Sequence, residues 1–141
     1  MANADTPMGF RPRRLINGGT VPSANAYPLA SAYGSNIFTG DAVVLTSGKL
    51  AVATAASTGL LGSFAGCQYT ASNGDIVFSA HWPASTVTSG SVDAVGYVYD
   101  NPDTVFEAQA SDDVAFVLAT HNLTLCDLVS THAGSTVTGQ S

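Results

Sequence analysis

Two apolar runs in the second half of the chain show the clearest strand patterns. In Thr104–Ala110 side chains alternate, with Phe106 and Ala108 on one side and polar groups on the other. The run Ala94–Tyr99 is apolar on both sides, which predicts a central strand covered on both faces. Between them, the Asn-Pro-Asp sequence at 101–103 is typical of a type I turn. We therefore expect a β-hairpin at the centre of a β-domain. Five of its side chains should be largely buried: Val95, Tyr97, Val98, Phe106 and Ala108.

Two further hairpins are predicted upstream of this one. The first pairs Ala42–Leu45 with Leu50–Thr54 through a Thr-Ser-Gly turn. The second pairs Leu60–Thr70 with Ile76–Ala80, and its loop contains Asn-Gly, a dipeptide favoured where the backbone needs a positive φ. No long amphipathic helix interrupts the series. The fold class predicted is all-β, a small barrel or sandwich built from successive hairpins.

The two ends of the chain lack this regularity. Residues 1–36 contain four of the six prolines and show no period of 2 or 3.6, which predicts an extended proline-rich arm. Regular structure is expected from about Asn36, in a β-domain of residues 37–141. Residues 111–118 fit a short capped helix, and a short turn or a further strand fits them equally well. The Gly/Ser/Thr-rich segment 134–141 is expected to be a mobile end.

The charge is low and unevenly distributed. Charged residues make up 10% of the chain, against roughly 25% in typical soluble domains. Such a composition suits a virion-like shell or a subunit buried in an assembly, although a monomer with an uncharged polar surface remains an alternative. The first fourteen residues carry +2, and the remaining 127 carry −8. An acidic body is repelled by phosphate, so nucleic-acid binding by the folded part is not expected.

No catalytic, cofactor or metal motif is found. The histidines lack ligand companions at short spacing, and Cys67 and Cys126 give no zinc site. We expect two buried thiols, with a single disulfide as the alternative. Trp82 is expected to anchor a core or an interface, although stacking on a sugar or base is an alternative. The acidic pairs at 100/103 and 112/113 suit turns and a helix start better than a cation site. The charge-free run 50–74 is too polar for a membrane span.

Several segments together carry a family resemblance. They are NADTPMGFRPRR with the following NGG, IFTGDAVVL, LLGSFAGCQYT, FSAHWPAST and AVGYVYDNPDTVFEAQA. The chain to about Ala110 resembles small proteins of tailed bacteriophages that decorate or cement the outside of the capsid. The resemblance implies a non-enzymatic virion protein that binds the major capsid protein on the outside of the capsid. The first ten residues lack the apolar segment of a signal peptide, so the protein is expected to be made in the host bacterial cytoplasm. A surface with so few charges needs covering, which predicts a homo-oligomer, and the resemblance favours a trimer.

The arm is the predicted contact with that partner. Its guanidinium groups can form bidentate bonds to carboxylates, and its apolar side chains can bury surface beside them. The candidate partner-binding residues are Phe10, Arg11, Arg13, Arg14, Leu15 and Ile16. The alternative is an arm that folds back over its own domain or pairs with its oligomer mates.

Two other classes of function stay open at this point. The first is a carbohydrate- or receptor-binding β-module, such as a head-fibre base, with Trp82, Tyr97 and Tyr99 as a stacking platform. The second is an enzyme whose site the sequence does not reveal.

Overall fold

The computed structural model describes residues 8–20, 23–109 and 134–141, and within them the chain is all-β. Eight strands form two antiparallel sheets, and one short 3₁₀ turn, Ser89–Ser91, precedes β7. The strands are β1 (Arg11–Leu15), β2 (Asn25–Leu29), β3 (Ala42–Thr46), β4 (Lys49–Val52), β5 (Gly62–Thr70), β6 (Ile76–Ser79), β7 (Ala94–Tyr99) and β8 (Thr104–Glu107).

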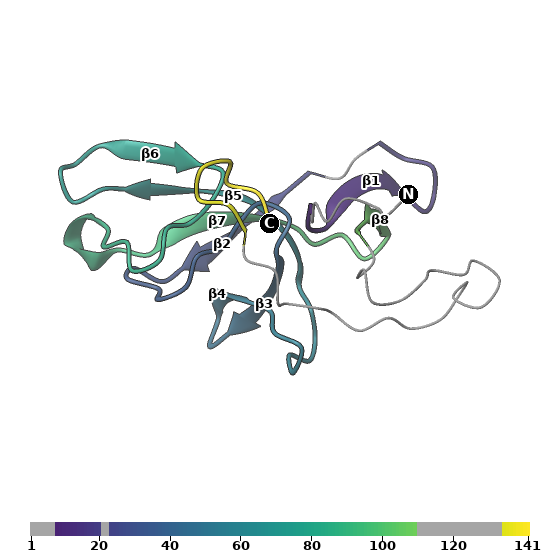
Figure 1. Cartoon of the computed structure of the whole chain (residues 1–141), viewed down its shortest axis with the longest axis horizontal. Coiled ribbons are helices and arrows are strands. Elements are labelled where there is room, and N and C mark those ends of the chain that lie inside the picture. The colour runs from purple at the N-terminus through teal and green to yellow at the C-terminus, as the bar shows by residue number, and fades with distance from the viewer. Residues whose placement is uncertain (1–7, 21–22, 110–133) are drawn as a thin grey trace, which may run out of the picture.

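The six-stranded sheet forms the body of the molecule (Figure 1). Its order is β2-β7-β5-β3-β4, and β6 pairs with the C-terminal half of β5. The sheet curves so that β2 and β4 contact each other, but within the described residues it does not close into a barrel. The architecture is that of an open, sandwich-like sheet wrapped around one core.

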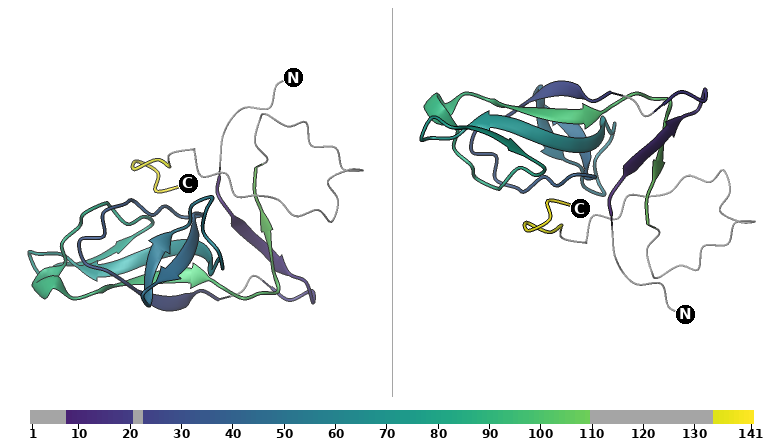
Figure 2. Two further views of the ribbon diagram at one scale, coloured as in Figure 1. Left: turned by 90° about the horizontal axis from the view of Figure 1, so that it is seen from below. Right: turned by 90° about the horizontal axis from the view of Figure 1, so that it is seen from above.

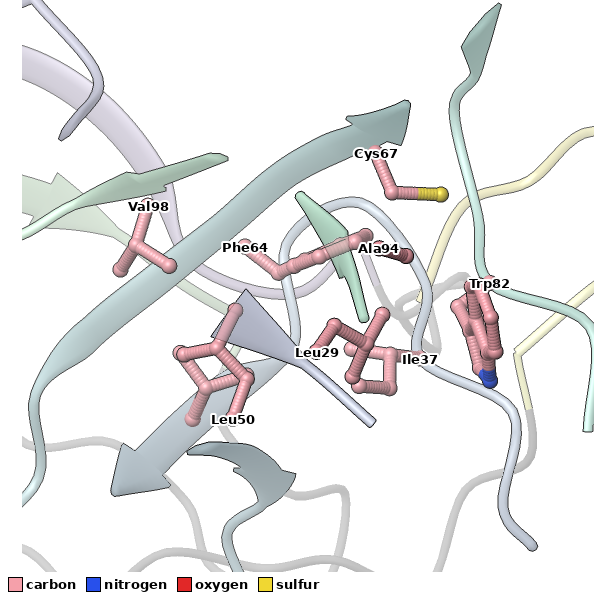
Figure 3. Packing of buried hydrophobic residues seen from close by; sticks show 9 residues of the cluster. Leu29, Ile37, Leu50, Phe64, Cys67, Trp82, Ala94 and Val98 are labelled. Atoms are coloured by element: carbon pink, nitrogen blue, oxygen red, sulfur yellow. The ribbon is translucent and has the colours of Figure 1, made fainter. Parts of the chain in front are cut away.

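Alternation along the strands builds that core on one face of the sheet (Figure 3). Along β7, every second residue is buried, so Val98 packs inward while Val95 and Tyr97 are half-buried on the other face. Gly96 is glycine because an added Cβ would lie 2.4 Å from a methyl of Leu50. The buried cluster consists of Leu29, Ile37, Val43, Leu50, Phe64, Cys67, Trp82, Ala94 and Val98.

The two upstream hairpins form as the sequence predicts. β3 pairs with β4 through a turn in which Ser47 and Gly48 have φ of 51° and 78°. β5 pairs with β6 through the Asn-Gly loop, where Gly74 has φ of 91°. Positive φ at these positions matches the right-handed twist of the flanking strands.

The predicted pairing of residues 94–99 with residues 104–110 is wrong, although the individual elements of this hairpin form. Both strands form, and the turn forms too: the Thr104 N–H donates to the Asn101 carbonyl at 3.0 Å. However, β7 is already paired on both edges, with β2 and β5, so the chain leaves the body and β8 pairs with β1. Phe106 is consequently half-buried and Ala108 is exposed. Of the five residues expected to be largely buried, only Val98 is, and β7 is fully covered on one face alone.

The proline-rich N-terminal segment is also more regular than expected. Its strands begin at Arg11, and β2 is an edge strand of the main sheet with Leu29 fully buried. Pro28 is tolerated there because an edge strand has one side without ladder hydrogen bonds. Strands of five residues are too short to show a clear period in sequence.

The described end of the chain contacts the body. The Thr39 N–H donates to the Gly139 carbonyl at 2.9 Å, and the Ser141 N–H donates to the Thr39 carbonyl at 3.1 Å. The segment expected to be mobile is thus hydrogen-bonded to the loop before β3. The predictions for residues 111–118, Cys126, His121 and His132 lie outside the described residues.

Candidate partner-binding surface

The β1–β8 pair stands apart from the main sheet as a two-stranded ribbon (Figure 2). The register places Arg11 opposite Glu107, Pro12 opposite Phe106, and Leu15 opposite Thr104. A register shift between Pro12 and Arg14 leaves Arg13 as the extra residue of a bulge. The ribbon therefore brings together the beginning of the chain and a segment more than ninety positions later.

The register separates the ribbon's side chains into two faces. Residues directly opposite each other share a face, and neighbours along a strand point to opposite faces. One face carries Pro12, Leu15, Thr104 and Phe106, which are all half-buried. The other, here called the basic face, carries Arg11, Arg14, Val105 and Glu107, and the Arg13 side chain reaches Glu107 from the bulge. All three arginines are exposed.

The basic face has a net charge of +2, from three arginines and Glu107. Arg13 is bonded to Glu107, with 62% and 43% of the two side chains exposed. Arg11 and Arg14 form no ion pair within the described residues. The other described cation, Lys49, is paired with Asp93 at 2.8 Å on the body. Counting the described residues alone, two guanidinium groups without an ion pair thus lie on one face of the ribbon, which projects from an acidic body.

Phe10 does not belong to this exposed surface. Its N–H donates to the Gly40 carbonyl at 2.7 Å, and its carbonyl accepts the Ser63 hydroxyl at 2.7 Å. Its ring packs against a small second cluster, formed by Ala42, Val44 and Ala53, and meets the Phe106 ring edge-on with centroids 6.3 Å apart. Phe10 thus helps to seat the ribbon on the body, and its predicted contact with a partner stays a prediction.

The other two apolar candidates differ from each other. Leu15 is half-buried and lines an open cleft of about 610 Å³ between the ribbon and the body. Ile16 is 67% exposed, and its N–H donates to the Asp103 carbonyl at 2.8 Å. The structure thus groups Arg11, Arg14 and Ile16 as accessible, and leaves Phe10 and Leu15 as supporting residues.

The cleft itself is polar and contains one carboxylate, Asp100. Asp100 accepts hydrogen bonds from the Asn25 amide and from the Tyr27 hydroxyl. The hydrogen bond to Asp100 raises the pKa of Tyr27, because losing the proton would place two negative charges together. Within the described part of the chain, no three His, Cys, Asp or Glu side chains are grouped to hold a metal.

Trp82 is not exposed for the stacking platform considered in the sequence analysis. Trp82 is fully buried, with its ring against Tyr69 and its indole N–H directed at the Tyr33 carbonyl at 3.4 Å. Trp82 is therefore a core residue, which agrees with the expectation that it anchors a core or an interface. Cys67 is likewise buried and free, and burial raises the pKa of its thiol to about 12.

One surface feature escaped the sequence interpretation. Ile76 and Phe78 on β6 are 64% and 73% exposed, although their apolar strand reads as a core element. No local signal in the sequence marks this exposure, because the uncharged run from Ile76 to Ser79 resembles a buried strand. These two side chains lie on the face of β6 that points away from the core, at an edge of the open sheet, so no described element packs on them.

No helix among the described residues is long and apolar enough to span a membrane. Comparison of the chain with known protein families, curated proteins and solved structures found no match to any of them.

Proposed function

We propose that this chain is a non-enzymatic structural protein of a tailed-phage virion. In this proposal it binds the outside of the assembled capsid and stabilises it as a decoration or cement protein. Its partner is an acidic surface of the major capsid protein. The resemblance of the N-terminal and hairpin segments to such proteins supports the class of function, and the low content of charge suits a protein covered by neighbours in a shell.

The observation that carries the proposal is the basic face of the β1–β8 ribbon. Three of the chain's four cations lie there, on an element that projects from a body of opposite charge. A carboxylate-bearing surface would be attracted to the ribbon and repelled by the body, which orients the protein on its partner. Arg11 and Arg14 supply the planar, bidentate geometry that carboxylates favour.

The strength of this contact depends on more than the arginines. Exposed ion pairs contribute only about 0–1 kcal/mol each. The exposed Ile16 next to β1 adds apolar surface, which is less sensitive to salt than the ion pairs. Binding is therefore expected to weaken with salt without disappearing.

Paired substitutions on the ribbon test the proposal. Arg11→Gln combined with Arg14→Gln removes both unengaged charges without breaking the Arg13–Glu107 pair. Binding to capsids that lack the protein is measured by co-sedimentation at low and moderate salt. We expect the double variant to lose about tenfold in affinity at low salt, and less at moderate salt.

Lys49→Gln is the matched control, because it removes one cation from the body rather than from the ribbon. If the ribbon variant binds as tightly as the unmodified chain at both salt concentrations, the proposed contact is wrong. Deleting residues 1–14 is a poorer test, because it would also remove Phe10 and most of β1, which hold the ribbon together.

The oligomeric state belongs to the same proposal. A homo-oligomer would cover uncharged surface, and a trimer follows from the resemblance rather than from any residue in the structure. Light scattering of the isolated protein, together with the arrangement of copies on particles, distinguishes a trimer from other states. A monomer in both settings would contradict it.

A further inference from the structure

Strand β6 leaves an unprotected edge on the main sheet. It pairs with β5 on one side, and no described strand pairs with it on the other (Figure 1). Other edges of the sheet carry features that discourage pairing: Pro28 lies in β2, and Lys49 begins β4. The sequence of β6, Ile-Val-Phe-Ser, has no charge, no proline and no bulge. Such an edge is a template for another strand.

The outer face of this edge is apolar. Ile76 and Phe78 project from the side of the sheet away from the core, 64% and 73% exposed. The β5 residues opposite them, Thr70 and Gln68, are uncharged. A strand added beside β6 would therefore cover two large apolar side chains and meet no charged group on that face.

The backbone of β6 is oriented for such an addition. The Asp75 carbonyl accepts the Ala71 N–H at 2.8 Å across the hairpin, so Asp75 directs its carbonyl toward β5. Because successive residues of a strand direct their backbone groups to opposite sides, the N–H and C=O groups of Ile76 and Phe78 point to the open edge.

We propose that the β6 edge pairs with the β6 edge of a second copy, antiparallel, about a twofold axis perpendicular to the sheet. Such an axis keeps the outer faces of the two sheets on the same side. One residue of β6 must then lie directly opposite the same residue of the second copy. With Val77 at the centre, Ile76 lies opposite Phe78 of the second copy, and Phe78 opposite its Ile76. The outward backbone groups of both residues then form the hydrogen-bonded pairs of the ladder.

Charge favours a second copy in this register. Asp75, the charged residue beside β6, falls opposite Ser79 of the second copy rather than opposite another carboxylate. Two chains of net charge −6 repel each other wherever acidic surfaces meet. At the β6 edge they can approach without placing like charges opposite each other. The apolar match of Ile76 with Phe78 occurs twice, because a twofold contact repeats every interaction.

Analytical ultracentrifugation over a range of concentrations tests this contact. We expect the unmodified full chain to show a reversible twofold dimerisation through β6, of single chains or of the trimers proposed above. Phe78→Lys should raise the dissociation constant of that dimer at least tenfold, since it replaces two central apolar contacts with charges. Val137→Lys is the control, because Val137 is 94% exposed on a different segment. Circular dichroism checks that both variants remain folded.

Amide hydrogen exchange supplies a second readout that locates the contact. The amides of Ile76 and Phe78 should become protected as protein concentration rises, and Phe78→Lys should abolish the dependence at Ile76. A chain that stays monomeric at roughly millimolar concentration, or an association that Phe78→Lys leaves unchanged, overturns the proposal. Protection that appears only when capsids are added would assign the edge to a capsid strand and also overturn it. None of these three outcomes bears on the basic face, which is tested by capsid binding.

Discussion

Phe64 and Phe106 contribute differently to the stability of the fold, because one lies in the main core and the other on the ribbon. Phe64 is fully buried in the centre of the main core, at the contact of β5 with β7. Phe106 is half-buried on the ribbon, where its main aromatic contact is the edge of Phe10. Alternation in sequence marks Phe106 as inward-facing but does not reveal that its strand belongs to a ribbon with little core behind it.

Replacing each phenylalanine by alanine should separate these two environments. Phe64→Ala should lower the free energy of unfolding by about 3–5 kcal/mol, because it leaves a cavity in a closed core. Phe106→Ala should lower it by only about 1 kcal/mol, close to the value of one aromatic pair. Chemical denaturation of the two variants measures the difference. Equal losses would mean that the ribbon is as well packed as the body.

Asp41 is the carboxyl group whose environment makes stability depend on pH. Burial raises its pKa, against the opposing effect of hydrogen bonds from the Phe38 backbone and the Ser141 side chain. Since its pKa is higher in the folded state, the folded chain holds the proton more tightly than the unfolded chain. The stability that Asp41 contributes is therefore present below its unfolded pKa, about 4, and is lost as pH rises through the folded value.

Asp41→Asn should remove this dependence. The amide oxygen can still accept the Phe38 N–H, which Asp41 accepts at 2.8 Å, and no charge is buried. We expect the variant to gain stability relative to the unmodified chain as pH rises from about 4 toward neutrality. Thermal unfolding of both proteins across this range gives the comparison. A difference that is constant with pH would show that burial does not perturb the group.

At the scale of elements, the ribbon and the body should differ in how tightly they hold their hydrogen bonds. A two-stranded sheet is marginally stable alone in water, and among the described residues it is mainly Phe10 and the half-buried face that secure the β1–β8 ribbon to the body. In contrast, β5 and β7 are each paired on both sides. Local opening therefore costs less in the ribbon than in the centre of the sheet.

Amide exchange in the isolated protein should reflect this order. The ladder amides of β1 and β8 should exchange at least about tenfold faster than those of β5 and β7. NMR of the protein at low concentration in deuterated buffer measures the two groups together. Equal protection in the isolated protein would indicate that the ribbon is covered. If the protein binds capsids as proposed, the β1 and β8 amides should become better protected on binding.

The elements that the sequence predicts well are those built from neighbouring residues. The β3–β4 and β5–β6 hairpins depend on short turns whose Gly residues mark them directly. The pairing of β1 with β8 joins positions far apart, and no local pattern encodes it. The turn at 101–103 is correct, yet the strand after it goes to another partner because β7 has no free edge.

At the scale of the whole molecule, the candidate site was only half visible in the sequence. The cluster of arginines was recognisable because cations are so few in this chain. The sequence left open, as an alternative, that the arm folds back over its own domain, as Phe10 does. It could not reveal that Glu107 engages Arg13, because that contact depends on the return of β8. The exposure of Phe78 was hidden for a similar reason, since an apolar strand looks the same at the centre and at the edge of a sheet.

The separation in sequence between β1 and β8 also determines when the basic face can appear during biosynthesis. β1 leaves the ribosome well before β8, so Arg13 must wait for Glu107, 94 positions later, before the ribbon can close. Closing so long a loop is slow unless the intervening chain has already folded and brought the ends together. The arginines therefore acquire their fixed arrangement only in a finished molecule. A nascent or misfolded chain would lack the basic face. If the proposed partner binds through that face, it would therefore select chains that have finished folding.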